Sequence, residues 1–447
     1  MLFRSRRWGR QGDPLLAVGD LLPLLMAWSS GARFGFLGTP KSDYTWASAA
    51  PPGWGSSPVA DAYHRCKGSE WDPWEWALMR HHRCRLVAVR DRLTAREVAA
   101  LHRSLFAAMG EGARKPQSFS NSRSPDRPLK VGLITADFHH QHPVNIFMQP
   151  VLARLDRSRF EVFMYHTGIA HDDQTQLARS RVDHWVASTT LSAVQLARRI
   201  ESDQIDVMVD LSGHTSLNRV PMLARRVAPV QLTFLGYPGS TGVPNIDWIL
   251  ADRIVAPEGS EPLYSERVMR LPHAVFCYAP EVAYPYPEYG EAHRSRPLTF
   301  GSFNNVPKLT PHTVTLWSRL LKRLPDARLV LKAPSFKDEM AVRAFRGRFE
   351  REGIASDRIE FRGPVGLTDM MAEYADIDIA LDPVPYNGGT TTLQALWMGV
   401  PVLVKAGQNF VSRMGASFMS AAGLSDWIAQ DDDDYIERAV RLSRDRD

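Results

Sequence analysis

The sequence predicts an α/β protein with two tandem Rossmann-like domains behind a poorly patterned N-terminal extension. From Leu129 onward, short apolar runs alternate with helix-like segments of about 10–15 residues, as in parallel sheets. A connection rich in Pro and Tyr interrupts this alternation at 281–297, and a second series of the same kind follows. We therefore expect an extension over 1–127, a first domain over 128–290 and a second domain over 291–447.

The extension has weak hydrophobic periodicity, and its one readable element is a helix over 93–110. Thr94 is placed to cap that helix, and Glu97 stands three residues later, at the capping-box position. Residues 115–128 have the composition of a linker. We therefore expect the extension to be partly helical and to end in a linker.

The first domain begins with LKVGLITADF, an apolar run suited to a buried parallel strand. Three similar runs follow, with helix-like segments between them: FEVFMYHTG, IDVMVDLSG and PVQLTFLGYPG. Three of the four runs end in polar segments that carry histidine or glycine, namely ADFHHQHPV, DLSGHT and LGYPGSTG. Ligands of such sheets bind at the carboxyl ends of the strands, so these segments are candidates for a binding site.

The second domain repeats the pattern with the runs LTFGSFN, ARLVLKA, IEFRGPV, IDIALDPVP and PVLVKAG. After the first run, Thr310 can cap a helix, and Pro311 takes the first helical position, where its missing N–H costs nothing. With two facing α/β sheets, the expected active site is a cleft between them.

The segment YNGGTTT follows IDIALDPVP and opens a helix. Gly388 and Gly389 would let the backbone approach a phosphate closely, and Thr390 and Thr391 would add hydroxyl donors at a helix N-terminus. The alternative is an ordinary glycine-rich turn with a threonine N-cap. Spacing alone leaves both interpretations open.

Two further positions could carry chemistry. Lys308 follows the first strand of the second domain, where it could neutralise a diphosphate, although a solvated loop lysine would look the same. A histidine of ADFHHQHPV could act as a base or orient a substrate at the matching strand end of the first domain. The alternative there is a surface histidine cluster.

The composition excludes several classes of partner. The chain has 447 residues, 44% hydrophobic and 23% charged, as in soluble globular proteins. Its positive charge is concentrated in the first 130 residues, where 20 Lys and Arg oppose 11 Asp and Glu, but that region matches no nucleic-acid-binding module. The run LLPLLMAW is too short to span a membrane. We therefore expect neither nucleic acid nor membrane as a partner.

The cysteines give no disulfide framework, because there are only three of them, Cys66, Cys84 and Cys277. This favours a reducing, cytoplasmic location. Two of them belong to an HxC…HHxC array whose separations match no standard zinc finger, so we expect no metal there. Its members are His64, Cys66, His81, His82 and Cys84.

Six motifs follow one another along the chain: ADFHHQHPV, VDLSGHT, LGYPGSTG, FGSFNNVPK, ALDPVPYNGGTTTLQALWMGVPVL and SRMGAS. Together they resemble the catalytic region of the O-linked N-acetylglucosamine transferase/SPINDLY family of glycosyltransferases, over roughly residues 93–439. The resemblance implies a GT-B fold, with two Rossmann-like domains that face a cleft holding a nucleotide-sugar.

The implied reaction is inverting transfer of a sugar, with N-acetylglucosamine expected, from a UDP donor to Ser or Thr hydroxyls of protein or peptide acceptors. The resemblance assigns His142 the role of base or acceptor-positioning group, and Lys308 the role of partner to the leaving diphosphate. The implied donor-binding residues are Asn305, Lys308, Gly366, Gly388, Gly389, Thr390, Thr391 and Gln394. Those implied on the sugar and acceptor side are His214, Gly236, Pro238 and Gly239.

No cofactor or metal is expected, since Lys308 and a helix N-terminus can stabilise the leaving diphosphate. The sequence DID at 376–378 imitates the DxD metal motif of other glycosyltransferases, but its setting reads as an internal strand.

The chain departs from the family at several points. Gln394 stands where the family usually has an acidic residue, Gly389 where some animal members have histidine, and Thr368 where a lysine packs on uracil. The alternatives are therefore GDP-fucose as donor, a small-molecule acceptor, or a non-catalytic nucleotide-sugar-binding protein. The sequence shows no tetratricopeptide repeats, and we expect the second domain to be truncated at its C-terminus.

Overall fold

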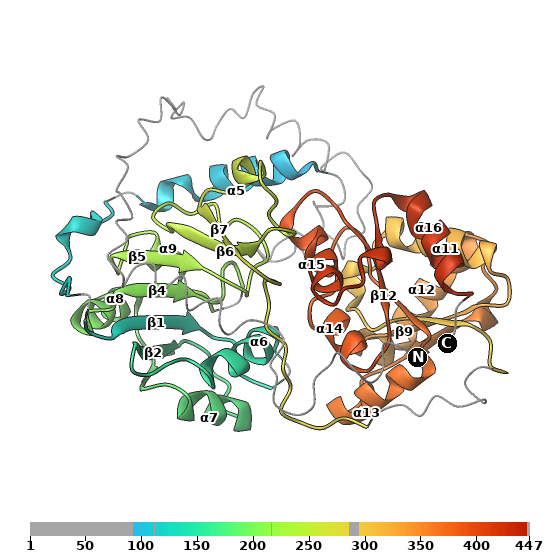
Figure 1. Cartoon of the computed structure of the whole chain (residues 1–447), viewed down its shortest axis with the longest axis horizontal. Helices are drawn as coiled ribbons and strands as arrows, with labels where there is room; N and C mark the ends of the chain where they lie inside the picture. Colours follow the sequence, from blue (N-terminus) through green and yellow to red (C-terminus); the bar gives the residue numbers. More distant parts are fainter. Residues whose placement is uncertain are drawn as a thin grey trace. The chain divides into compact units, whose positions relative to one another are not determined.

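The computed structural model describes residues 93–110, 112–124, 126–140, 142–215, 217–285 and 295–444. These residues form two compact units, each around its own sheet (Figure 1). Within the described residues, the first unit holds 93–251 and 258–272, and the second holds 252–257 and 273–444. The first unit thus ends at 272, whereas the sequence places the boundary at 290. The predicted HxC…HHxC array lies outside the described residues.

The first unit is built on a seven-stranded sheet in the order β3-β2-β1-β4-β5-β6-β7. β1 pairs in parallel with both β2 and β4, which is the strand order of a Rossmann fold. The four apolar runs predicted from the sequence form β1, β2, β4 and β5. The strands are β1 Leu129–Thr135, β2 Phe160–His166, β3 His184–Ala187, β4 Val207–Asp210, β5 Val230–Thr233, β6 Trp248–Asp252 and β7 Arg267–Leu271.

The hydrophobic pattern does not reveal β3, β6 and β7. β3 and β7 are the two outer strands, and each buries only one residue fully, so neither has the continuous apolar run of a central strand. β6 is buried over four of its five residues, but it lies outside the predicted apolar runs.

Four of the five helices described in the first unit begin at side-chain caps, and α9 is the exception. Thr94 and Glu97 form the predicted capping box, with the Glu97 carboxylate accepting from the Thr94 N–H at 2.8 Å. Ser192 and Gln195 form another at the start of α8. The helices are α5 Ala95–Phe106, α6 Pro143–Leu152, α7 Asp173–Ser180, α8 Ala193–Ser202 and α9 Val220–Leu223, with 3₁₀ turns η2 Ala107–Gly110, η3 Pro116–Ser118 and η4 Glu261–Leu263.

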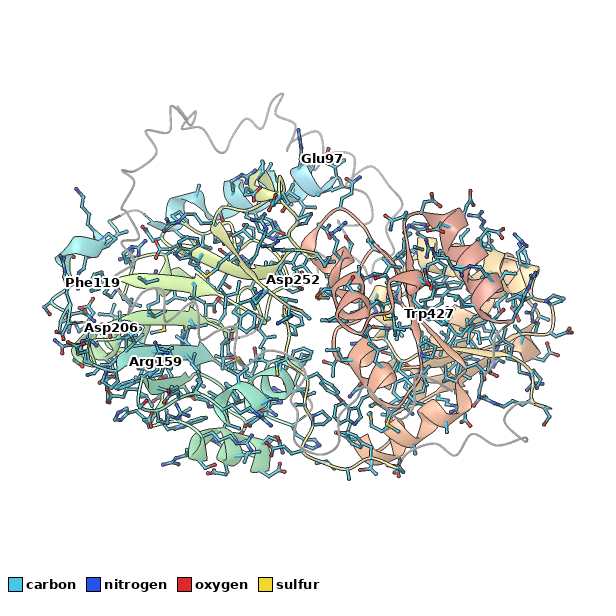
Figure 2. The ribbon with its side chains drawn as sticks, viewed as in Figure 1. Glu97, Phe119, Arg159, Asp206, Asp252 and Trp427 are labelled. Atoms are coloured by element: carbon cyan, nitrogen blue, oxygen red, sulfur yellow. The ribbon has the colours of Figure 1, made fainter. Side chains whose placement is uncertain are left out.

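The predicted linker at 115–128 is anchored to the first unit through Asp206, labelled in Figure 2. Asn121 Nδ2 donates to Asp206 Oδ1 at 2.9 Å, and the Arg127 guanidinium donates to both carboxylate oxygens at 2.6 and 2.8 Å. Asp206 is fully buried, so this charge is compensated by a bidentate partner. Two side chains therefore hold a segment that has the composition of a linker.

The second unit has a six-stranded parallel sheet in the order β10-β9-β8-β11-β12-β13. Its five predicted runs form the first five strands, whereas β13 has only two residues and gives no pattern. The strands are β8 Thr299–Ser302, β9 Arg328–Lys332, β10 Ile359–Arg362, β11 Ile379–Leu381, β12 Val402–Lys405 and β13 Ile428–Ala429.

Helices pack on this sheet around a core that includes Phe300, Trp317, Phe349 and Tyr435. The predicted cap of α11 is present, since the Thr310 side chain accepts from the Thr313 N–H and Pro311 takes the first helical position. The helices are α11 Pro311–Arg323, α12 Glu339–Arg351, α13 Leu367–Ala372, α14 Thr390–Trp397, α15 Met414–Ala421 and α16 Asp432–Leu442, with 3₁₀ turns η5 Val306–Lys308, η6 Pro334–Lys337, η7 Ser356–Arg358, η8 Glu373–Asp376, η9 Phe410–Ser412 and η10 Ser425–Trp427.

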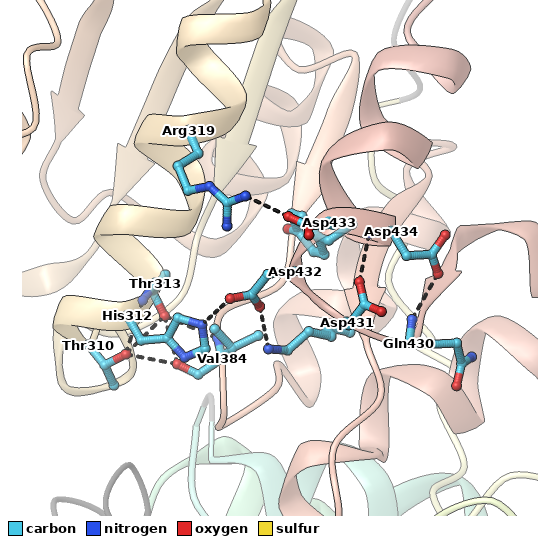
Figure 3. A network of polar contacts seen from close by, with 12 residues as sticks. Thr310, His312, Thr313, Arg319, Val384, Gln430, Asp431, Asp432, Asp433 and Asp434 are labelled. Carbon is cyan, nitrogen blue, oxygen red and sulfur yellow. Dashed lines mark hydrogen bonds and ion pairs between the residues drawn. The ribbon is translucent and has the colours of Figure 1, made fainter.

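The last helix, α16, is held to α11 and β12 by polar contacts at its N-terminus (Figure 3). Asp432 accepts from His312 Nε2 at 2.7 Å and from Lys405 Nζ at 2.5 Å, and Asp433 accepts from Arg319 at 2.6 Å. Acidic side chains also favour the positive end of the helix dipole. No helix among the described residues has the length and apolar character that a membrane span needs.

Candidate active site

In the second unit, the loop after β8 carries Lys308 to the segment Tyr386, Asn387, Gly388 and Gly389, which we call the glycine loop. Lys308 Nζ donates to the Asn387 carbonyl at 2.8 Å and lies 4.4 Å from the centroid of the Tyr386 ring. Burial lowers the pKa of Lys308 to about 8, against the opposing charge of Asp382. The ammonium is therefore still mostly charged at pH 7 and sits in a poorly solvated environment, where it attracts anions strongly.

The glycine loop leads directly into α14, whose N-terminal amides have no side-chain cap. Thr390 opens the helix, and its buried hydroxyl oxygen has no hydrogen-bond partner among the described residues. Free amides at a helix N-terminus, an adjacent ammonium and an unused hydroxyl together suit a phosphate. The arrangement thus favours the anion-binding interpretation over the ordinary turn.

The two glycines of this loop differ in their surroundings. A Cβ on Gly388 would lie 2.2 Å from Thr392 Oγ1 and 2.7 Å from Asp382 Oδ1, so no larger residue fits there. A Cβ on Gly389 would meet no atom within 4 Å. Gly388 is therefore required for the close packing of the loop, whereas Gly389 faces open space at the helix N-terminus.

Two residues of this site were not predicted from the sequence. Asp382, at the end of β11, accepts from the Gly388 N–H at 2.7 Å and from Thr392 Oγ1 at 3.2 Å, and its burial raises its pKa to about 6. Asn304 is buried, and its Oδ1 accepts from Thr391 Oγ1 at 3.0 Å and lies 3.5 Å from Lys308 Nζ. A polar residue within two positions of the end of a buried strand is the signal that could have identified both.

The other predicted donor residues lie on neighbouring segments. Asn305 is exposed, and in the described part of the chain its side chain makes no hydrogen bond. Gly366 is the exposed N-cap of α13. Gln394 is buried one turn along α14 from Thr390, and its side chain has no hydrogen bond to a described residue. Their roles in donor binding stay predictions.

In the first unit, His142 caps α6 at the end of the segment that follows β1. Its Nδ1 accepts from the Val144 N–H at 3.3 Å, and its Nε2 faces Asp137 Oδ1 at 3.5 Å. His139 lies beside it, with ring centroids 5.0 Å apart. Because Nδ1 accepts a hydrogen bond, the proton of the neutral ring lies on Nε2.

The segments after β4 and β5 pack tightly against each other. A Cβ on Gly236 would lie 2.1 Å from the Leu211 carbonyl oxygen, so the close approach of the two backbones requires glycine. His214 Nε2 donates to the Thr241 carbonyl at 2.6 Å, and its ring stacks on Phe106 of α5 at 4.2 Å. Pro238 and Gly239, which follow, are half-buried. The predicted residues His214, Gly236, Pro238 and Gly239 thus share one region of the first unit, which α5 covers.

A strand-end carboxylate supports the glycine-bearing segment in each unit. Asp210 accepts from the Gly213 N–H at 2.9 Å in the first unit, as Asp382 does from Gly388 in the second. Burial raises the pKa of Asp210 to about 6 as well.

The predicted setting of the DID sequence is wrong. η8 ends at Asp376 and β11 begins at Ile379, so these residues precede the strand. Asp376 accepts from Arg362 at 2.7 Å, whereas Asp378 pairs with Arg296 at 3.4 Å. The two carboxylates are therefore engaged by different arginines.

Comparison with known proteins decides the family. The model of glycosyl transferase family 41 matches residues 79–285 and 289–447. The chain belongs to this family. Membership in family 41 confirms the resemblance inferred from the six motifs, and the two Rossmann-like units confirm the predicted GT-B fold class.

The family 41 relatives include plant and bacterial proteins. The chain is 33% identical over 338 residues to the probable UDP-N-acetylglucosamine–peptide N-acetylglucosaminyltransferase SPINDLY of Solanum lycopersicum, covering 73% of this chain and 36% of that protein. It is 29% identical over 329 residues to the corresponding protein SEC of Arabidopsis thaliana, covering 70% and 33%. A mutant O-GlcNAc transferase from Thermobaculum terrenum superposes with a TM-score of 0.77 at 31% identity, covering 87% of this chain and 73% of that one. The chain spans about a third of the length of the SPINDLY and SEC proteins.

Proposed function

We propose that this chain is a protein O-glycosyltransferase that transfers N-acetylglucosamine from UDP-N-acetylglucosamine to Ser or Thr hydroxyls. The names of its family 41 relatives support this donor and a peptide acceptor. The observation that carries the proposal is the junction of Lys308 with the uncapped N-terminus of α14, which suits a leaving diphosphate.

In the proposed reaction, the acceptor oxygen attacks the anomeric carbon and the bond from that carbon to the diphosphate oxygen breaks. UDP leaves with the electron pair, and the hydroxyl proton passes to solvent. Lys308, the α14 amides and the Thr390 hydroxyl stabilise the charge that develops on the diphosphate. No metal is assigned to this step.

His142 is proposed to position a reactant. Its Nδ1 is engaged by the Val144 N–H, so the neutral ring offers an N–H at Nε2 and not a lone pair. The geometry therefore supports a hydrogen-bond donor more than a general base.

The test is incubation of the protein with radiolabelled UDP-N-acetylglucosamine or GDP-fucose and a host-cell lysate. We expect label from the UDP donor on proteins, released by β-elimination. If only GDP-fucose transferred label, the donor would be GDP-fucose and not the proposed UDP-sugar. If label appeared only on small molecules, the acceptor would be a small molecule and not a protein. Saturable UDP binding without transfer would favour a non-catalytic binding protein, a possibility supported by the uncharged Gln394. Protein acceptors and a cytoplasmic location stay predictions.

A further inference from the structure

We propose that Asp137, His139 and His142, here called the Asp–His–His triad, bind one Zn²⁺ ion, and that this ion inhibits the enzyme. The second half of the proposal rests on the transferase function proposed above. The sequence treats these histidines singly and predicts no metal site. The fold brings all three together at the end of β1, with one potential ligand atom from each residue within 4.8 Å of the others.

The spacing of the triad is close to that of a zinc site. Zn–N and Zn–O bonds of about 2.0–2.2 Å put tetrahedral ligands roughly 3.3–3.5 Å apart. His142 Nε2 and Asp137 Oδ1 already lie 3.5 Å apart. The His139 ring is half-buried beside His142, so a small side-chain rotation can close the remaining gap.

Neighbouring hydroxyls orient the carboxylate of the triad. Asp137 is buried, and its Oδ2 accepts from Thr215 Oγ1 at 3.2 Å and from Ser212 Oγ at 3.4 Å. These contacts hold Oδ2 and leave Oδ1 turned toward His142. Outer hydrogen bonds of this kind fix the ligands in natural zinc sites.

The ligand chemistry selects the ion. Two imidazoles and one carboxylate suit Zn²⁺ and neighbouring transition-metal ions such as Fe²⁺, Co²⁺ and Ni²⁺, whereas Mg²⁺ and Ca²⁺ prefer all-oxygen sites. Three protein ligands leave a fourth position for water. The positive end of the α6 dipole opposes a cation there, and the buried Asp137 charge offsets this opposition.

Inhibition follows from which ring nitrogen of His142 carries the proton. Its Nδ1 accepts from Val144 in the metal-free ring, so its Nε2 carries the proton. Zn²⁺ on Nε2 moves that proton to Nδ1 and breaks the 3.3 Å contact with the Val144 N–H. The N–H that we assign to reactant positioning is then lost, and the ion occupies its place.

The test compares His139→Ala with His140→Ala, because His140 is an exposed neighbour outside the triad. Zinc bound per chain is measured by equilibrium dialysis and elemental analysis, and Co²⁺ loading by its visible absorption. Any zinc held by the HxC…HHxC array is common to all the proteins and cancels in the difference. We expect wild type and His140→Ala to bind one more zinc per chain than His139→Ala, with an intense tetrahedral Co²⁺ spectrum.

Transfer activity is then titrated with Zn²⁺ and, as a control, Mg²⁺. We expect His139→Ala to keep its basal activity and to need at least about tenfold more Zn²⁺ for half inhibition, since one of the three metal ligands is gone. Equal zinc stoichiometry in wild type and His139→Ala would overturn the site. A site that binds zinc without inhibiting would overturn the inhibition. If the protein shows no transferase activity at all, the stoichiometry and the Co²⁺ spectrum still decide whether the site exists.

Discussion

The ammonium of Lys308 donates a hydrogen bond to the carbonyl oxygen of Asn387 at 2.8 Å. This bond joins the loop after β8 to the glycine loop, so the cation and the N-terminus of α14 are held together before a ligand arrives. Preorganised charge of this kind costs no rearrangement when negative charge develops on a leaving group.

Lys308→Met is expected to lower the transfer rate by about 100-fold or more, because it removes the cation from the diphosphate site. UDP binding by wild type should also weaken as pH rises through about 8, where Lys308 loses its proton, and this dependence should vanish in the variant. Isothermal titration with UDP from pH 6.5 to 9 measures the binding, and transfer of radiolabel to acceptor protein measures the rate. Lys337→Met, at an exposed lysine of the same unit, is the control. If Lys308→Met and Lys337→Met bound UDP with equal affinity, Lys308 would not be part of the UDP-binding site.

The two glycines of the glycine loop should differ in how strongly they respond to the same change. In Gly388→Ala the new methyl group meets Thr392 and Asp382 at contact distances that cannot be accommodated, which costs about 1–3 kcal/mol and displaces the loop. In Gly389→Ala it meets open space. We expect UDP affinity to fall at least about tenfold in the first variant and by less than about threefold in the second, since 1.4 kcal/mol is a factor of ten. Similar losses in both would mean that the packing around Gly388 does not set the geometry of the site.

Features set by local chemistry could be predicted from the sequence, and features set by tertiary contacts could not. Thr94 and Thr310 cap helices as predicted, because a cap depends on residues three positions away. The sequence did not predict β13, because a strand of two residues is too short to show hydrophobic alternation. The family resemblance implies Asn305 as a donor-binding residue, whereas the structure buries the adjacent Asn304 against Lys308 and Thr391. Beyond a strand the twofold alternation ends, so sequence alone cannot tell which of two neighbouring side chains turns inward.

Asn304 and Asn305 therefore form a natural pair for comparison. Asn304→Ala leaves the Thr391 hydroxyl without its acceptor, removes the second, longer contact of Lys308, and should destabilise the second unit by about 1–3 kcal/mol. Asn305→Ala changes an exposed side chain and should alter stability by less than about 0.5 kcal/mol. Hydrogen exchange of the β8 amides, followed by mass spectrometry, reports on this unit alone. UDP titration of the folded variants then asks separately whether Asn305 binds the donor, and an unchanged affinity would remove it from the predicted site.

The contacts at the start of α16 predict a salt-sensitive contribution to stability. Asp432→Asn weakens the contacts with His312 and Lys405 and removes a negative charge from the helix N-terminus, at a cost of about 0.5–1 kcal/mol in low salt. Asp433→Asn removes a charge from the same helical turn but breaks only a pair with an exposed arginine, so its loss should be smaller. Urea denaturation at 20 mM and 500 mM NaCl, read by exchange of the α16 amides, separates the two. A salt-independent loss for Asp432→Asn would mean that the loss is not electrostatic.

The last prediction concerns the pH dependence that Asp382 gives to the second unit. Burial raises its pKa to about 6 from the usual 3.8, so the folded chain binds a proton between these values more readily than the unfolded chain does. The ionised carboxylate therefore destabilises the fold at pH 7, by about 3 kcal/mol at 1.36 kcal/mol per pKa unit, and this cost is relieved as pH falls from about 7 to 4.

Asp382→Asn has a side chain of the same shape that cannot ionise. The unfolding free energy of this variant should therefore lack the pH dependence that Asp382 causes. We expect the unfolding free energy of the second unit to rise in wild type relative to Asp382→Asn as the pH is lowered, mostly between pH 6.5 and 4.5. Because Asp210 titrates in a similar range in both proteins, its contribution cancels from the difference. Exchange of the β8 and β11 amides in urea, measured for both proteins at each pH, gives that difference. A constant difference from pH 7 to 4.5 would show that Asp382 is not the group with the raised pKa, and that the glycine loop is held without a costly buried charge.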